Sequence, residues 1–216
     1  MINLYNMDCM EAMYKAPDNH WDLAICDPPY GIGYSNQRIR VKPSRPNSVG
    51  YDIKYPVGAW DSNHPTKEYF VELFRVSKNQ IIWGANYFCD MLPPGKGWIF
   101  WNKKNGIDNS FSDGEFAYSS KGIQSRYVAL SVNNKMNRAG KDRIHPTEKP
   151  YGLYTWLLER MAKQGDRILD THLGSGSIAL ACHDMGFHLD GFEIDQEYFD
   201  NASKRLKNHQ RQLKLF

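Results

Sequence analysis

A strand, a glycine-containing turn and a helix are predicted in direct succession at 167–181, and this unit constrains the fold most. The apolar run 167–170 is typical of a buried strand, Gly174 and Gly176 follow it, and a helix is expected to begin near Ser177. The glycines let the backbone approach a ligand closely, and the first N–H groups of the helix point toward that ligand. We therefore expect an α/β protein with a ligand at the carboxyl edge of a sheet.

The residues around this turn bear on the kind of ligand. Gly174, Gly176 and Ala179 fit the fingerprint of dinucleotide-binding proteins, so the turn alone also permits a nicotinamide-dependent oxidoreductase. Asp170 directly precedes the turn, where its carboxylate can pair with the amino group of a methionine but would repel a pyrophosphate. The turn also has fewer glycines than a pyrophosphate cradle usually requires. Both features favour S-adenosylmethionine over a nicotinamide cofactor.

A further strand is predicted at 188–192, directly before Glu193. From the end of that strand, the Glu193 carboxylate can bind both ribose hydroxyls of a nucleoside. Ile194 follows and is expected to lie against the adenine ring.

Another apolar run, 21–26, predicts a buried strand that leads into Asp27-Pro28-Pro29-Tyr30. Proline has a fixed φ and no N–H, so the two prolines continue neither a helix nor a central strand, and their carbonyls can accept hydrogen bonds. The tetrapeptide therefore offers a carboxylate, a rigid acceptor backbone and an aromatic face. For these four residues alone, a proline-rich turn without a catalytic role is the alternative.

This combination suits the methylation of an amino group attached to a nucleobase. Such a nitrogen is a poor nucleophile because its lone pair is delocalised into the ring, but both of its hydrogens can be donated. Asp27 and the Pro28 carbonyl would accept these hydrogens and stabilise the positive charge that grows during attack on a sulfonium methyl. Tyr30 would supply a stacking surface worth about 1–3 kcal/mol to an unstacked base.

The segment 145–150 reads His-Pro-Thr-Glu-Lys-Pro and precedes a predicted helix at 151–160. Its hydroxyl and ammonium at a helix start form a ready site for a carboxylate. With the Asp-Pro-Pro-Tyr motif and the glycine turn, this segment makes the chain resemble the DNA amino-methyltransferases, which methylate adenine N6 or cytosine N4. The resemblance extends from Asp8 to about Leu206. Its motif order, catalytic before cofactor-binding, is the permuted order of one large group of these enzymes.

The resemblance implies a Rossmann-like S-adenosylmethionine-dependent methyltransferase fold, with a mostly parallel twisted sheet, one reversed strand and helices on both faces. It implies catalytic roles for Asp27, Pro28, Pro29 and Tyr30. An acid at the position of Asp8 contacts the adenine end of the cofactor, although Met7 replaces the usual glycine, and Asp8 could instead cap a helix. The implied cofactor-binding residues are Asp8, Asp27, His145, Thr147, Lys149, Asp170, Leu173, Gly174, Ser175, Gly176, Ser177, Glu193 and Ile194, with Thr147 and Lys149 holding the methionine carboxylate.

Positive charge is concentrated in three segments, although the net charge is only +3. The segments are 31–60, 121–143 and 203–216, and the first follows Tyr30 without apolar periodicity, as expected of a long functional loop. We predict that this basic loop clamps nucleic acid, and the segment 121–144 lies where the family keeps a target-recognition insert. The candidate DNA contacts are Arg38, Arg40, Lys42, Arg45, Lys121, Arg126, Lys135, Arg138, Lys141 and Arg143.

The length of 216 residues fits a single methyltransferase domain, 1–216, that contains both basic segments. We also predict strands at 2–6, 80–84, 97–102 and 115–119, the last two as a hairpin-like pair, and helices at 65–77 and 197–212. Neither an export signal nor an apolar run of about 20 residues is visible, so we expect a cytoplasmic protein without membrane association. The four cysteines form no Cys-x-x-Cys pair, and neither disulfides nor a metal are expected.

The sequence thus predicts a DNA methyltransferase that flips an adenine out of double-stranded DNA and methylates its N6 amine. Methylation of cytosine N4 uses the same chemistry and is the nearest alternative. RNA or a protein amide as substrate, a nicotinamide-dependent oxidoreductase and a DNA-binding protein without catalysis are weaker alternatives. The sequence leaves open whether the protein forms a homodimer or works beside a restriction nuclease.

Overall fold

The computed structural model describes residues 1–32, 39–41, 51–53, 64–95, 97–104, 112–122, 124–131 and 148–211, with backbone alone at 39–41 and 51–53. The chain divides into two compact units. The first joins Met1–Pro28 to Thr66–Phe216, and the second is Pro29–Pro65. The described part of the second unit contains an antiparallel pair of short strands, β3 (Ile39–Val41) and β4 (Tyr51–Ile53).

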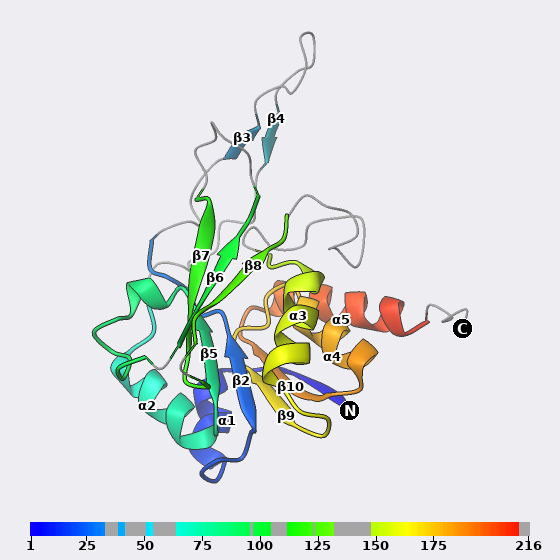
Figure 1. The fold of residues 1–216 in the computed structure, drawn as a ribbon. Coiled ribbons are helices and arrows are strands. Elements are labelled where there is room, and N and C mark those ends of the chain that lie inside the picture. The colour runs from blue at the N-terminus through cyan, green and yellow to red at the C-terminus, as the bar shows by residue number, and fades with distance from the viewer. Residues whose placement is uncertain are drawn as a thin grey trace. The chain divides into compact units, whose positions relative to one another are not determined.

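The first unit is built on an eight-stranded sheet with the order β1-β10-β9-β2-β5-β7-β6-β8 (Figure 1). Its strands are β1 (Ile2–Asn6), β2 (Leu23–Cys26), β5 (Gln80–Trp83), β6 (Gly97–Asn102), β7 (Gly114–Ser119), β8 (Arg126–Ala129), β9 (Arg167–Asp170) and β10 (His188–Glu193). Neighbouring strands from β1 to β5 pair in parallel, whereas β7 pairs antiparallel with both β5 and β6. Because β8 is again parallel to β6, β7 is the one reversed strand of the described sheet. This arrangement confirms the predicted fold class.

Helices cover both faces of this sheet, with α1 and α2 on one side and α3 and α4 on the other (Figure 1). They are α1 (Cys9–Lys15), α2 (Lys67–Val76), α3 (Tyr151–Met161), α4 (Ser177–Met185) and α5 (Gln196–Arg211), and a short 3₁₀ helix, η3 (Ala85–Tyr87), follows β5. Side chains fix two of the helix starts: the Asp8 carboxylate accepts a hydrogen bond from Met10 N at 2.9 Å, and Thr66 Oγ1 accepts one from Tyr69 N.

The strands alternate between these two helical layers. In β2, Leu23 and Ile25 belong to the buried cluster that includes α3 and α4. Cys26 points to the opposite face, where it interacts with Tyr69 of α2. Because successive side chains of a strand point to opposite faces, the next residue, Asp27, returns to the α3 side. The alternation of side chains along β2 therefore places Asp27, the catalytic candidate, on the α3 face of the sheet.

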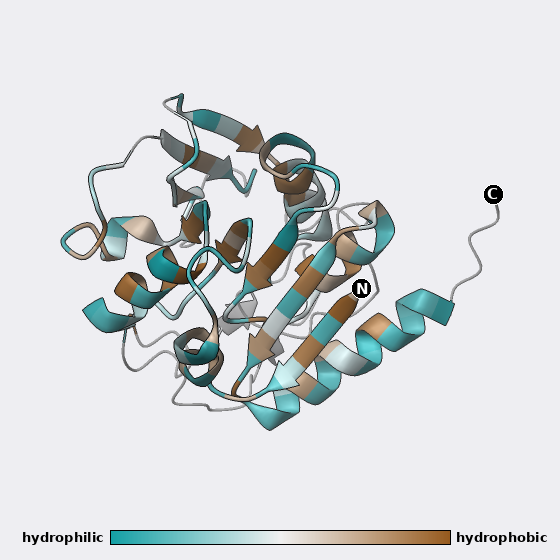
Figure 2. Cartoon of the chain, turned by 90° about the horizontal axis from the view of Figure 1, so that it is seen from below, coloured by the Kyte–Doolittle hydropathy of each residue, from teal (hydrophilic) through white to brown (hydrophobic). Residues whose placement is uncertain are grey.

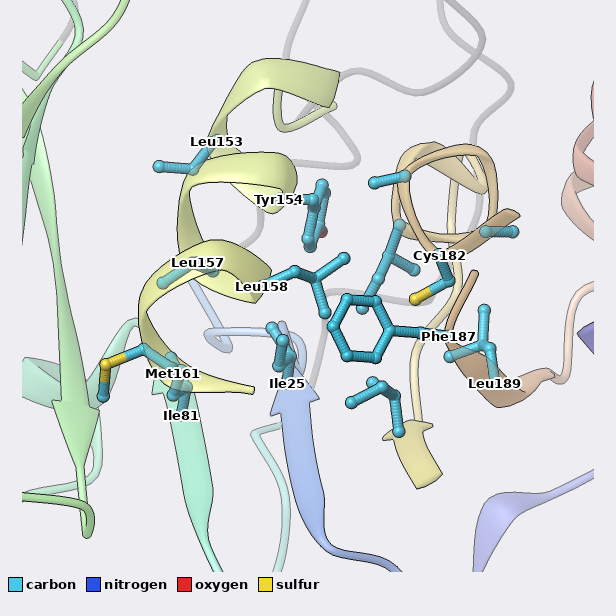
Figure 3. Packing of buried hydrophobic residues seen from close by; sticks show 14 of the residues in the cluster. Ile25, Ile81, Leu153, Tyr154, Leu157, Leu158, Met161, Cys182, Phe187 and Leu189 are labelled. Atoms are coloured by element: carbon cyan, nitrogen blue, oxygen red, sulfur yellow. The ribbon is translucent and has the colours of Figure 1, made fainter. Parts of the chain in front are cut away.

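The core on the α3 side consists of aliphatic and aromatic side chains from the two helices and the sheet. Figure 3 shows Leu158 of α3 pointing toward Ile25 and Phe187. Leu157 and Leu158 have no exposed surface. This packing holds α3 in place, together with residues 148–150 directly before it.

Helix α5 packs against β1, the edge strand of the sheet, and is hydrophilic along most of its length (Figure 2). Its buried residues are Tyr198, Ala202 and Leu206, which recur every four residues and therefore share one face of the helix. Among the described residues, no helix is long and apolar enough to cross a membrane.

The strands and helices predicted from the sequence are confirmed, with ends shifted by one or two residues, except that α4 continues to Met185, beyond the predicted end at 181. Three strands were missed. β3 and β4, of three residues each, fall inside the segment 31–60 that was interpreted as a loop, and β8 falls inside the segment 121–144 that was interpreted as a polar insert. The four residues of β8, Arg126–Ala129, have only Val128 buried, so they lack the apolar pattern that identifies a strand. The first part of the segment 121–144 therefore belongs to the main sheet.

Candidate active site

Three acids lie at the carboxyl ends of neighbouring parallel strands. Glu193 is the last residue of β10, Asp170 is the last residue of β9, and Asp27 directly follows β2. The sheet order β10-β9-β2 makes these three strand ends adjacent. Each acid also lies an even number of residues after a member of the α3-side core, so all three share one face as well as one edge.

Asp27 is held by a buried lysine from the segment before α3. Lys149 Nζ lies 2.5 Å from Asp27 Oδ2 and 3.0 Å from Glu115 Oε2. Lys103 Nζ lies 2.5 Å from the other oxygen of Glu115. We call this series, Asp27–Lys149–Glu115–Lys103, the ion-pair chain.

The reversed strand brings Glu115 to this edge. Because β7 runs against its neighbours, its first residues lie where the parallel strands end, and Glu115 pairs in register with Trp101 of β6. Lys103 follows directly after β6. The Lys149 ammonium also lies 5.3 Å from the ring centroid of Trp83, at the end of β5, which adds a cation–π contact.

The ion-pair chain is stable in its charged form. Burial opposes the charge on Lys149, whose side chain is 2% exposed, but the carboxylates of Asp27 and Glu115 outweigh this and raise its pKa. For Glu115, burial favours the neutral form, and the two lysines nevertheless hold the pKa below its usual range. A deeply buried ammonium thus separates two carboxylates at the edge of the sheet.

Among the acids at this edge, Asp170 has the most strongly shifted pKa. It is 2% exposed, and burial raises its pKa to about 8, with the hydrogen bond from His172 N opposing the shift and the charges of Asp27 and Glu193 adding to it. At neutral pH this carboxyl therefore holds a proton. A cation beside it would favour its ionised form, so the edge fits a ligand with positive charge, such as the ammonium and sulfonium of S-adenosylmethionine.

The glycine turn is fixed by Glu193 and by α5. Glu193 accepts hydrogen bonds from Gly174 N at 2.8 Å and Asp195 N at 3.0 Å. Gly176 has φ +72°, and a Cβ there would lie 3.0 Å from that of Ala202 in α5, so the position requires glycine. The turn and the start of α4 are thereby held in one shape.

Glu148 connects the motif at 145–150 to this turn through Arg205. Its carboxylate lies 3.0 Å from Arg205 Nη2, and Arg205 Nη1 donates to Ser175 O at 3.0 Å and to Ser177 Oγ at 3.2 Å. Consecutive residues Glu148 and Lys149 therefore join the two halves of the predicted site: one contacts the cofactor half and the other contacts Asp27.

The remaining predicted cofactor-binding residues differ in burial and in their contacts. Leu173 is buried and donates from its backbone to Phe192 O, Asp8 caps α1, and Ile194 is 68% exposed. His145 and Thr147 lie outside the described residues. Lys149 contacts two carboxylates, and its predicted bond to the methionine carboxylate stays a prediction, as do the other cofactor contacts. Pro28 is buried in the first unit, whereas Pro29 and half-buried Tyr30 open the second unit.

Most of the predicted DNA contacts lie outside the described side chains, namely Arg38, Arg40, Lys42, Arg45, Lys135, Lys141, Arg138 and Arg143. Lys121 donates from Nζ to Met161 O at 2.7 Å, where it satisfies a carbonyl at the end of α3. It follows the end of reversed β7, at the edge of the sheet opposite Asp27. Arg126 is exposed at the start of β8. Neither position lies at the acidic edge.

Sequence reasoning missed three charged residues of the site. Glu115, which contacts Lys149, Lys103, which contacts Glu115, and Glu148, which contacts Arg205, were not singled out, although Glu148 stands inside a recognised motif. For Glu115, a signal was present, because it is the one charged residue of β7 and lies on the same face as buried Ala117, which implies a charged partner.

Solved structures share this architecture. M1.HpyAVI in complex with S-adenosylmethionine has a TM-score of 0.61 and 20% identity, with 95% of this chain and 100% of that chain covered. A putative DNA modification methylase from Thermus thermophilus, TTHA0409, in complex with S-adenosyl-L-methionine, has a TM-score of 0.57, 15% identity and coverages of 99% and 98%. The PvuII DNA methyltransferase, cytosine-N4-specific, has a TM-score of 0.62, 12% identity and coverages of 94% and 86%. The fold is that of S-adenosylmethionine-dependent methyltransferases.

Sequence comparisons define the family. The Type II methyltransferase M.HinfI of Haemophilus influenzae is 24% identical, with 93% of this chain and 67% of the relative covered. M2.MboI of Moraxella bovis is 26% identical, with coverages of 94% and 87%. The chain belongs to the DNA methylase family of N6 and N4 methyltransferases, whose pattern matches residues 78–204. It is a DNA methyltransferase with S-adenosylmethionine as its cofactor. The matched segment begins after Asp27–Tyr30.

Proposed function

We propose that this protein methylates the exocyclic N6 amine of an adenine that is flipped out of double-stranded DNA. The main support is the adjacency of Asp27 to Asp170 and Glu193 at neighbouring strand ends of one edge. An amine bound at Asp27 and a cofactor bound at the other two acids would occupy the same edge of the sheet. Flipping the base costs a few kcal/mol, which contacts to the extruded base must offset.

In this proposal, Asp27 and the Pro28 carbonyl accept the two hydrogens of the amine. These acceptors draw the nitrogen toward tetrahedral geometry and stabilise the positive charge that develops on it. S-adenosylmethionine supplies the electrophilic methyl group when it is bound. Tyr30 stacks on the base, a role assigned from its place in the Asp-Pro-Pro-Tyr motif.

The cofactor is assigned to the other half of the edge. Asp170 pairs with the amino group of its methionine, and Glu193 binds the ribose hydroxyls and at the same time fixes the glycine turn through Gly174 N. Thr147 and Lys149 are assigned to the methionine carboxylate, and the basic residues of 31–60 to the phosphates of DNA.

The experiment is a methylation assay with the purified protein, S-adenosylmethionine and genomic DNA, followed by mass spectrometry of the nucleosides. We expect N6-methyladenine from the wild type and none from Asp27→Ala, whose affinity for the cofactor falls only modestly. Asp90→Ala is the matched control, because Asp90 is an exposed acid after η3. Full turnover by Asp27→Ala would refute the assignment of the catalytic acid.

Cytosine N4 is the second candidate product, because the cytosine-N4-specific PvuII methyltransferase shares the fold with a TM-score of 0.62. The same mass spectrum separates the two. N4-methylcytosine in place of N6-methyladenine would replace the adenine assignment and leave the roles of Asp27 and Pro28 unchanged.

A further inference from the structure

The ion-pair chain joins the proposed catalytic acid to β6 and β7, an antiparallel pair that contains none of the three motifs identified in the sequence. Glu115 and Lys103 come from β7 and from the residues after β6, and both are about one-fifth exposed. Lys149, between Glu115 and Asp27, is almost fully buried. A charged side chain of β7 thus contacts the same ammonium as the catalytic acid.

The contact between Lys149 and Asp27 creates a difficulty for the proposed reaction. The amine of the substrate must donate to the Asp27 carboxylate, and one oxygen of that carboxylate is 2.5 Å from the Lys149 ammonium. The other oxygen can still accept, but an ammonium bonded to the carboxylate neutralises part of its negative charge and weakens it as an acceptor for the amine. An unpaired buried charge is strongly unfavourable. The Lys149 ammonium can therefore move away from the Asp27 carboxylate only if a second anion stays in contact with it.

Within the protein, Glu115 meets that requirement, in addition to the cofactor carboxylate to which Lys149 is assigned. Its Oε2 lies 3.0 Å from Lys149 Nζ, so the ammonium can move toward Glu115 without losing ionic contact. Lys103 holds the other oxygen of Glu115 at 2.5 Å and keeps this carboxylate ionised in its partly buried position. The Trp83 ring, 5.3 Å from Lys149 Nζ, adds a further contact for the charge.

We propose that Glu115 is a positioning residue for methyl transfer: it holds the Lys149 ammonium while the Asp27 carboxylate accepts the hydrogen bond of the substrate amine. This inference rests on the proposed function and deepens it. Glu115 does not touch the substrate; it acts through Lys149. Lys103 supports it by fixing the Glu115 carboxylate.

The test is the variant Glu115→Gln, which keeps the shape of the side chain and removes its charge. Lys149 then loses one of the two carboxylates that it contacts in the described part of the chain, and its contact with Asp27 becomes harder to give up. We expect kcat to fall about tenfold or more, with the KM for the cofactor within about threefold of the wild type. Glu115→Asp, which keeps the carboxylate, should recover part of kcat. Glu159→Gln is the matched control on the surface of α3, where Glu159 contacts only the neighbouring Arg160 in the described structure.

A double-mutant cycle with Lys149→Met separates this role from a structural one. If Glu115 acts through Lys149, Glu115→Gln changes kcat by less than about twofold once Lys149 is gone. Independent, multiplying effects of the two substitutions, or an unchanged kcat in Glu115→Gln alone, would overturn the proposal. Should Glu115→Gln fail to fold, Lys103→Gln replaces it, and unchanged kcat there would count equally against it. A wild type that methylates no DNA base refutes the proposed function itself, whereas these variant outcomes refute only the role of Glu115.

Discussion

The raised pKa of Asp170 makes the stability of this protein depend on pH in a direction opposite to that of most acids. The carboxyl group is 2% exposed at the end of β9, and its pKa lies at about 8, against an ordinary value of 3.8. Burial is the largest cause, and the charges of Asp27 and Glu193 add to it. The perturbation that tests this is Asp170→Asn, which mimics the protonated acid and can still accept the hydrogen bond from His172 N.

The sign follows from counting protons. Between pH 4 and 8 the folded protein holds a proton on Asp170 that the unfolded chain has lost, so rising pH favours unfolding. The stabilisation is complete below about pH 4 and is lost at about pH 8. One proton corresponds to about 1.4 kcal/mol per pH unit, so this group lowers the free energy of unfolding by about 2–3 kcal/mol between pH 5 and 7.

The assay is urea denaturation of the wild type, Asp170→Asn and the exposed control Asp90→Asn at pH 5, 6 and 7. We expect the wild type and the control to lose about 2–3 kcal/mol more than Asp170→Asn over this range. Equal pH slopes in all three proteins would refute the assignment of a buried, protonated Asp170. Adding S-adenosylmethionine should flatten the wild-type slope, because its ammonium would favour the ionised carboxyl.

Two further substitutions test the packing and the cofactor turn. Leu157→Ala removes a fully buried side chain of α3 and should lower the free energy of unfolding by about 2–5 kcal/mol, measured in urea; a loss below about 1 kcal/mol would contradict the packing. Arg205→Met removes the ion pair with Glu148 and the hydrogen bond to Ser175 O, and should weaken S-adenosylmethionine binding about tenfold by calorimetry. The exposed neighbour Lys204 provides the control Lys204→Met, and equal affinities of the two variants would contradict that role.

The motifs could be predicted because their signals are local. Two prolines after an apolar run can only end a strand, and glycines between a strand and an apolar helix can only form a turn, so Asp27 and Asp170 were placed at strand ends from the sequence. Asp8 shows the limit of such reasoning. A capping role and a cofactor role were both open, and the structure shows the cap, through Met10 N.

The ion-pair chain could not be predicted in the same way. Glu115 and Lys149 are far apart in the sequence, and their contact depends on β7 being reversed and on α3 packing over β2 and β5. Neither fact leaves a local pattern. The resemblance assigned Lys149 to a cofactor carboxylate, and only the folded chain shows that it contacts two carboxylates of the protein.

By itself, the sequence determined the strand ends, the glycine turn and the face of each acid, because backbone restrictions and the two-residue period of a strand act over a few neighbouring residues. The tertiary structure alone decided which charges meet, since burial and long-range strand pairing select the partners of Asp27 and raise the pKa of Asp170. Charge compensation in a low-dielectric interior depends on every group within a few ångströms, and that neighbourhood exists only after folding.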